Sequence, residues 1–98
     1  MNKVEISGGL IARPEPVHNV DGTPMYRFCI AVNKADGSGE CDFFDCVCVC
    51  QPYDTNDRVL RFVTSGNKIQ VVGSLSILKN DMNYTKIVVK AATVKFGT

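Results

Sequence analysis

The chain has 98 residues, which suffice for one folded domain and are too few for two, so we expect a single domain over residues 1–98. Hydrophobic residues make up 45% and charged residues 21%, which excludes wholesale disorder, and a net charge of +1 excludes a general positive field for polyanions. No stretch approaches the ~18 consecutive apolar residues of a membrane span, and the N-terminus does not resemble a secretory signal. We therefore expect a cytoplasmic protein without membrane contact.

The first predicted strand alternates between apolar and polar residues. Val4, Ile6 and Leu10 are in step with one another, and the glycine pair at residues 8–9 predicts a bend or bulge within the strand. Pairing is expected to stop at residues 13–16, because the two prolines there lack the backbone donor that a sheet needs.

Two further strands are predicted before the middle of the chain. Residues 26–32 alternate cleanly after a turn signal at residues 21–22. A flexible loop tip at residues 35–39 precedes a third strand from about residue 41 to residue 50. From residue 43 on, one of its two alternating sets is entirely apolar, namely Phe44, Cys46, Cys48 and Cys50, and is expected to face the core, which places Phe43 on the opposite side.

The chain contains five cysteines and one histidine. Cys46, Cys48 and Cys50 share one face of the third strand, where we expect them to act as small buried hydrophobic residues. The alternatives are a thiolate metal site or a redox pair. Neither is favoured, because the spacing is not that of paired C-x-x-C ligands and His18 is distant in the sequence. We expect no metal and no cofactor.

Helical periodicity replaces the alternation between residues 52 and 65. Asp54 or Thr55 is a candidate N-cap, and Gly66 is a candidate C-cap. The apolar residues at helical spacing are Val59, Leu60, Phe62 and Val63. The sequence therefore predicts one short amphipathic helix.

Strand character returns at residues 68–75 and 84–96, which a polar segment at residues 79–83 connects. The predicted order is thus three strands, one helix and two strands. This is the order of an all-β OB-fold, a five-stranded Greek-key barrel with one short helix between strands 3 and 4. Glycines at residues 8–9 suit the first strand of such a barrel, which must bend to pair on both sides.

Along nearly its whole length the chain resembles the bacterial single-stranded DNA-binding protein (SSB) family. The resembling residues are 1–4, Gly8, Leu10, 13–15, 28–33, 42–44, Leu60, Phe62, Gly66, Val72, Gly73, Leu75, Tyr84, Val88, Val89 and Ala91. The resemblance implies sequence-independent binding of single-stranded DNA in replication, recombination or repair. It also implies a homo-oligomer, either a dimer or a tetramer. The sequence ends at Thr98 without the acidic tip common in the family, so we expect a short form without that recruiting role.

Binding of single-stranded DNA requires a positive groove for phosphates and aromatic faces on which bases stack. The aromatic candidates are Phe43 first, then Tyr84 and Tyr53. The basic candidates are Lys3, Lys79 and Lys86, followed by Arg27 and Lys68; Lys3 and Lys79 stand where the family carries a lysine. For each ring the alternative is a packing role, and for each lysine or arginine it is a solvated surface charge.

Two features predict weak DNA binding. Family members often carry further stacking aromatics where this chain has residues 35–36, Val49 and residues 79–80. Residues 35–57 also contain six acidic residues and no lysine or arginine, which adds repulsion toward phosphates. The alternative function is therefore an SSB-like scaffold or protein-interaction module of the primosomal type. We do not expect an enzyme, because no activating base stands near the cysteines. We also expect no small-molecule substrate.

Overall fold

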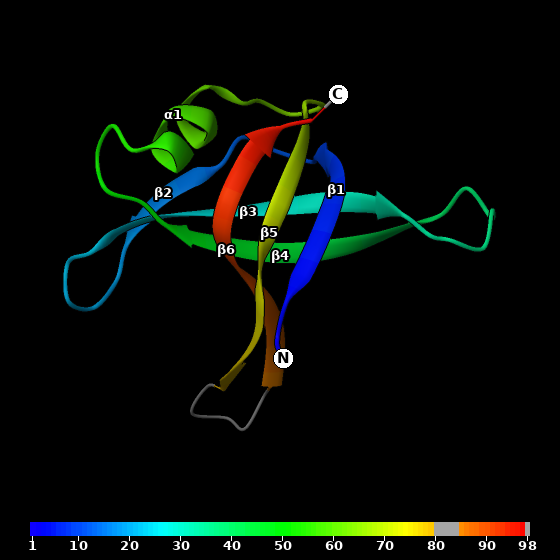
Figure 1. Ribbon diagram of the computed structural model, residues 1–98, viewed down its shortest axis with the longest axis horizontal. Helices are drawn as coiled ribbons and strands as arrows, with labels where there is room; N and C mark the ends of the chain where they lie inside the picture. The colour runs from blue at the N-terminus through cyan, green and yellow to red at the C-terminus, as the bar shows by residue number, and fades with distance from the viewer. Residues whose placement is uncertain (80–84, 98) are drawn as a thin grey trace.

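The computed structural model describes residues 1–79 and 85–97. Its elements are β1 (Val4–Leu10), β2 (Glu15–His18), β3 (Pro24–Asn33), β4 (Cys41–Val49), α1 (Thr55–Phe62), β5 (Lys68–Lys79) and β6 (Thr85–Phe96). The strands form one sheet in the order β1-β5-β6-β4-β3-β2, and an additional β1–β3 pairing closes five of them into a barrel (Figure 1). The predicted all-β OB-fold, with one short helix between the third and fourth barrel strands, is confirmed.

The first strand closes the barrel at its glycine pair. β1 pairs with β5 from Val4 to Gly9, and Gly9 and Leu10 also pair with β3. The two backbones approach so closely that a Cβ added to Gly8 would lie 2.2 Å from the carbonyl oxygen of Ala31. Glycine at this position is therefore a condition of barrel closure, in agreement with the bend expected from the sequence.

The strand β2 was not predicted from the sequence. Residues 15–18 pair with β3 in an antiparallel register that places Glu15 opposite Arg27 and Pro16 opposite Tyr26. The expectation that pairing stops throughout residues 13–16 is therefore wrong for the last two of them. β2 is the outermost strand of the sheet, and proline is tolerated on such an edge because its missing N–H need not face a partner.

β5 is longer than predicted and forms an arm together with β6. It continues to Lys79 instead of ending near Leu75, and it pairs with β6 as far as Thr85. A bulge lies between Val72 and Gly73, and beyond it β6 still pairs with β4 at Val89 and Lys90. The outer part of the hairpin, residues 75–79 and 85–88, extends downward in Figure 1 as a two-stranded arm.

The helix begins at the predicted position, with Asp54 as N-cap accepting a 2.7 Å hydrogen bond from the backbone N–H of Asp57. Its buried side includes Val59 and Leu60, which pack into the core together with the C-cap residue Val63. Phe62, expected on the same apolar side, is 71% exposed. Val59, Leu60 and Val63 form the side of this segment that faces the core, and the ring of Phe62 lies outside that side.

The predicted C-cap is also wrong. The helix ends at Phe62 with Val63 as C-cap in an extended conformation, so Gly66 lies beyond the cap. Gly66 instead has a φ of 90° within a turn that joins the helix to β5. The side chain of Asn67 closes this turn by accepting a 2.8 Å hydrogen bond from the N–H of Thr64. The glycine is used for a turn conformation rather than for helix termination.

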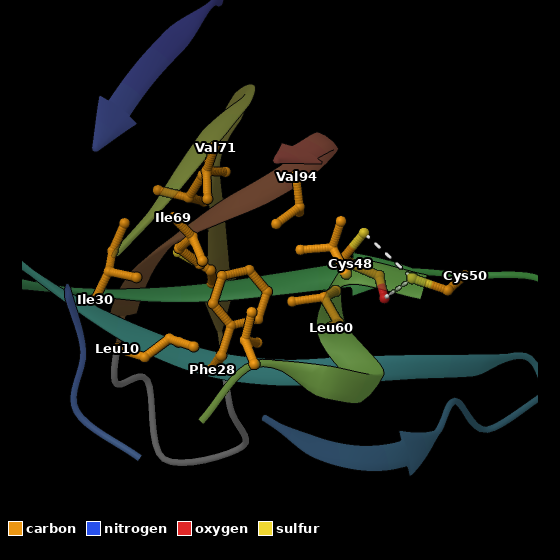
Figure 2. Close-up of a cluster of buried hydrophobic side chains, with 13 residues drawn as sticks. Leu10, Phe28, Ile30, Cys48, Cys50, Leu60, Ile69, Val71 and Val94 are labelled. Carbon is orange, nitrogen blue, oxygen red and sulfur yellow. Dashed lines mark hydrogen bonds between the residues drawn. The ribbon is translucent and has the colours of Figure 1, made fainter. Parts of the chain in front are cut away.

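The core fills the barrel between the strands and the helix (Figure 2). Its members are Leu10, Phe28, Ile30, Cys46, Cys48, Cys50, Val59, Leu60, Val63, Ile69, Val71, Val89 and Val94. The three cysteines are at most 3% exposed, which confirms the prediction that they act as buried hydrophobic residues. Burial raises the pKa of the Cys46 thiol to about 12, so this thiol stays protonated and unreactive in the folded state.

This burial predicts selective labelling of the cysteines. A thiol-reactive probe is expected to modify at most two thiols of the native protein, the half-buried Cys29 and Cys41. Cys46, Cys48 and Cys50 should react only after unfolding in denaturant, because thiolate formation and access are both suppressed in the core. Mass spectrometry of the labelled chain measures the difference. Modification of all five at the unfolded rate under native conditions would contradict this core.

Candidate nucleic-acid interface

The outer surface of β3 and β4, which we call the β3–β4 face, is set by strand alternation. Because Cys46 and Cys48 of β4 point into the core, Phe43, Asp45 and Val47 point outward. The ring of Phe43 is 64% exposed. In the register of the two strands, Arg27 of β3 lies opposite Val47, so a guanidinium group and an aromatic ring share this face.

A groove of about 430 Å³ lies between the β3–β4 face, the segment after β1 and the arm. Arg13 and Arg27 line one part of it, and Leu78 and Lys86 line it from the arm. Cationic groups beside apolar side chains suit a ligand that presents phosphates and flat bases together. Asp45 also lines the groove and opposes the phosphate part of such a ligand.

Two ion pairs involve residues of β4 that are near Phe43 in the sequence. The carboxylate of Asp45, on the same outward side as Phe43, is 3.0 Å from Nζ of Lys86, which reaches across from the arm. The carboxylate of Asp42 is 2.7 Å from Nζ of Lys34 at the end of β3, but as the neighbour of Phe43 in the strand it belongs to the other side of the sheet. In both pairs the side chains are about a third to a half exposed, so they remain within reach of a ligand in solution.

A second polar cluster joins the helix to β3. The carboxylate of Asp57, only 5% exposed, accepts hydrogen bonds from the Tyr26 hydroxyl at 3.1 Å, the Tyr53 N–H at 2.9 Å and the Arg61 guanidinium at 2.9 Å. Burial alone would raise the pKa of Asp57, but these bonds outweigh it and the pKa is lowered. Tyr53 takes a φ of 66°, and its exposed ring lies over the Arg61 guanidinium at 5.2 Å.

Comparison with known proteins identifies the family. Residues 1–96 match the single-strand binding protein family. The chain belongs to this family. It is 32% identical over 76 residues to a single-stranded DNA-binding protein of Clostridium perfringens, an alignment that covers 76% of this chain and 49% of that protein. The chain thus spans about half the length of this curated relative. Membership of a family of DNA-binding proteins agrees with the expectation that the chain is not an enzyme.

Solved structures share the architecture of this single-strand binding family member. The wild-type single-stranded DNA-binding protein of Thermus aquaticus superimposes with a TM-score of 0.75 at 20% identity, covering 100% of this chain and 41% of that one. A Plasmodium falciparum SSB solved in complex with single-stranded DNA gives a TM-score of 0.77 at 21% identity, covering 100% of this chain and 96% of that one. At these identities the likeness establishes the fold.

The structure of this family member brings three of the predicted site residues together. Phe43 and Arg27 lie on the β3–β4 face, and Lys86 reaches it from the arm. Lys79 is exposed at the far end of β5, on the same arm. Tyr84 lies outside the described residues. These placements agree with a site built from β3, β4 and the arm.

The other predicted residues lie elsewhere. Lys3 precedes β1, with its Nζ 3.7 Å from a carboxylate oxygen of Glu5. Lys68 begins β5 at the end of the barrel opposite the arm, where its carbonyl accepts a 2.8 Å hydrogen bond from Gly97. Tyr53 belongs to the cluster around Asp57. None of these three lines the groove, and their part in DNA binding stays a prediction, since strand alternation alone does not tell which side of a barrel a surface lysine occupies.

Sequence reasoning missed Arg13, which follows β1 and lines the groove. The available signal was its position directly after the first predicted strand. The pairing of Lys34 with Asp42 was also not predicted, because it depends on the return of β4 alongside β3.

Two classes of site are absent from the described part of the chain. No group of three or more His, Cys, Asp or Glu side chains within residues 1–79 and 85–97 is placed to hold a metal ion. Within the same residues, no helix is long and apolar enough to cross a membrane.

Proposed function

We propose that this chain binds single-stranded DNA through the β3–β4 face, without sequence preference, in replication, recombination or repair. The observation that carries the proposal is the 64% exposed ring of Phe43 on the face where Arg27 and Lys86 line a groove. Stacking of a base on such a ring contributes ~1–3 kcal/mol and tolerates every base, because each base has a flat face. The family membership and the names of its relatives support this function.

The affinity is expected to be modest. Among the described residues, Phe43 is the only aromatic side chain directed to the outside of β3 and β4, since Tyr26, Phe28 and Phe44 belong to the inward set. Val47 and Val49 occupy the outward positions further along β4. They offer apolar contact but no stacking surface, so fewer bases gain stacking energy.

Replacing Phe43 with alanine is expected to weaken binding of oligothymidine by ~1–3 kcal/mol while leaving the domain folded. Fluorescence anisotropy measures the affinity, and thermal unfolding measures the integrity of the fold. Phe62→Ala is a matched control, because this ring is 71% exposed on α1, away from the face. A folded Phe43→Ala protein that binds as tightly as the parent would remove this ring from the site.

We also propose that the chain forms a homo-oligomer, either a dimer or a tetramer. β1 pairs with β3 only at Gly9 and Leu10, so among the described residues the edge of residues 4–7 turned away from β5 has no ladder partner. An open strand edge favours pairing with a second chain. Analytical ultracentrifugation tests this proposal, and a monomer at micromolar concentration would contradict it. The cytoplasmic location expected from the sequence stays a prediction.

One observation favours the second candidate function, an SSB-like protein-interaction or scaffold module. Four apolar side chains of the arm are 46–63% exposed: Leu75, Ile77, Leu78 and Ile87. Exposed apolar clusters mark protein contacts. A salt series separates the two functions, because DNA binding through phosphates weakens as salt rises, whereas a scaffold shows little oligothymidine binding at any salt.

A further inference from the structure

A carboxylate near Phe43 opposes the binding of phosphates that we propose for this face. Asp45 projects into the groove two residues from Phe43, which is ~7 Å along an extended strand. Its oxygen lies 3.0 Å from Nζ of Lys86. Lys86 is one of the cations available in the groove to a phosphate, and in the free protein its partner is a carboxylate of the chain itself.

We infer that Asp45 competes with DNA phosphates for Lys86 and thereby lowers both the affinity for single-stranded DNA and its dependence on salt. The inference rests on the proposed function.

Accessibility makes this competition effective. The side chains of Lys86 and Asp45 are 55% and 51% exposed, so a phosphate can approach and replace the carboxylate. The displaced carboxylate then remains near the bound strand, well within the ~10 Å over which charges interact at 0.1 M salt. DNA therefore meets two costs at this position, the broken ion pair and the repulsion that follows.

The salt dependence reports on the same exchange. A lysine that neutralises a phosphate of a single strand contributes ~0.7 to the slope of log affinity against log salt, because the strand releases condensed cations. When Lys86 exchanges one anion for another, the freed Asp45 attracts cations again and offsets this release. The slope of the parent protein is therefore smaller than its number of phosphate contacts implies.

The decisive variant is Asp45→Asn, which keeps the shape of the side chain and removes its charge. We expect oligothymidine binding to tighten ~2–5-fold at low salt, the range of an exposed ion pair. We also expect the salt slope to steepen by ~0.7. Both are measured by anisotropy titrations at several salt concentrations, with thermal unfolding confirming that the variant remains folded.

Asp21→Asn is the matched control for net charge. It removes the same charge from an exposed carboxylate in the turn before β3, where Asp21 accepts hydrogen bonds from the N–H and the hydroxyl of Thr23, away from the groove. We expect it to leave affinity and slope close to those of the parent. Equal tightening by Asp45→Asn and Asp21→Asn would overturn the inference, because net charge alone would then explain the gain.

A second background tests the role of Lys86 directly. In a Lys86→Ala protein, Asp45→Asn should leave the salt slope unchanged, because the contested cation is gone. A slope that steepens equally in both backgrounds would overturn the competition for Lys86. If the parent binds oligothymidine and depends on Phe43 but Asp45→Asn gains nothing, only this inference fails. If the parent does not bind, the proposed function fails with it.

Discussion

Replacing Gly8 with alanine is expected to lower the free energy of unfolding by ~3 kcal/mol, the upper part of the range for overpacked sites. The added Cβ would lie 2.2 Å from the carbonyl oxygen and 2.9 Å from the carbonyl carbon of Ala31. Both are backbone atoms, so no side-chain rotation relieves the clash. β1 must move away from β3, and the pairing that closes the barrel is lost with that movement.

Gly9→Ala is the matched control for this prediction. A Cβ at Gly9 meets no heavy atom within 4 Å, although the residue is the next one in the same strand. Denaturant unfolding followed by circular dichroism measures both variants. The account requires a large loss for Gly8→Ala and a small change for Gly9→Ala, and equal losses would mean that the close approach to β3 does not determine stability.

Replacing Asp57 with alanine is expected to cost ~2–3 kcal/mol of stability, because a nearly buried acceptor of several hydrogen bonds is removed. The hydroxyl of Tyr26 and the N–H of Tyr53 lose their partner, and the Arg61 guanidinium loses its counter-charge. The half-exposed Arg61 can be hydrated instead, which keeps the loss below that of a fully buried ion pair. Urea unfolding at pH 7 measures the change.

The pH dependence supplies a separate test of the same carboxylate. The pKa of Asp57 is lowered in the folded state, so its contribution to stability is present above the ordinary aspartate pKa of ~3.9 and is lost as the pH falls through the folded value. The stability difference between the parent and Asp57→Asn should therefore be largest near neutral pH and shrink in acid. A difference that stays constant from pH 7 to pH 3 would contradict the assigned role of the charge.

Strand alternation explains why much of the β3–β4 face was predictable. The period-two pattern of β4 places Cys46 and Cys48 inside and Phe43 outside, because successive side chains of a strand point to opposite faces. The same local argument includes Asp54, whose side chain caps the first turn, as one of its two N-cap candidates. Such features depend on neighbouring residues alone.

The features that were missed depend on contacts between distant parts of the chain. β2 forms because β3 offers an edge to residues 15–18, which the two prolines of that region conceal in the sequence. Lys3 and Lys68 do not line the groove, which depends on how the closed barrel arranges the strands. The pairing of Asp45 with Lys86 joins residues of β4 and β6. Its effect on binding was expected only as a general repulsion by acidic residues.

The fold and the proposed site are physically linked. Closure at Gly8 brings β1 against β3, and the segment that follows β1 supplies Arg13 to the groove. The Asp57 cluster ties the helix to Tyr26 of β3, one residue from Arg27. Loss of either feature is therefore expected to disturb the geometry of the β3–β4 face as well as global stability.

Backbone amide shifts recorded by NMR during titration with oligothymidine test the central claim most directly. The account predicts shift changes concentrated in β3 and β4 around Arg27, Phe43 and Val47, and in the arm around Lys86. Changes confined to α1 or to the outer side of β1, or no changes at concentrations where anisotropy shows binding, would contradict it.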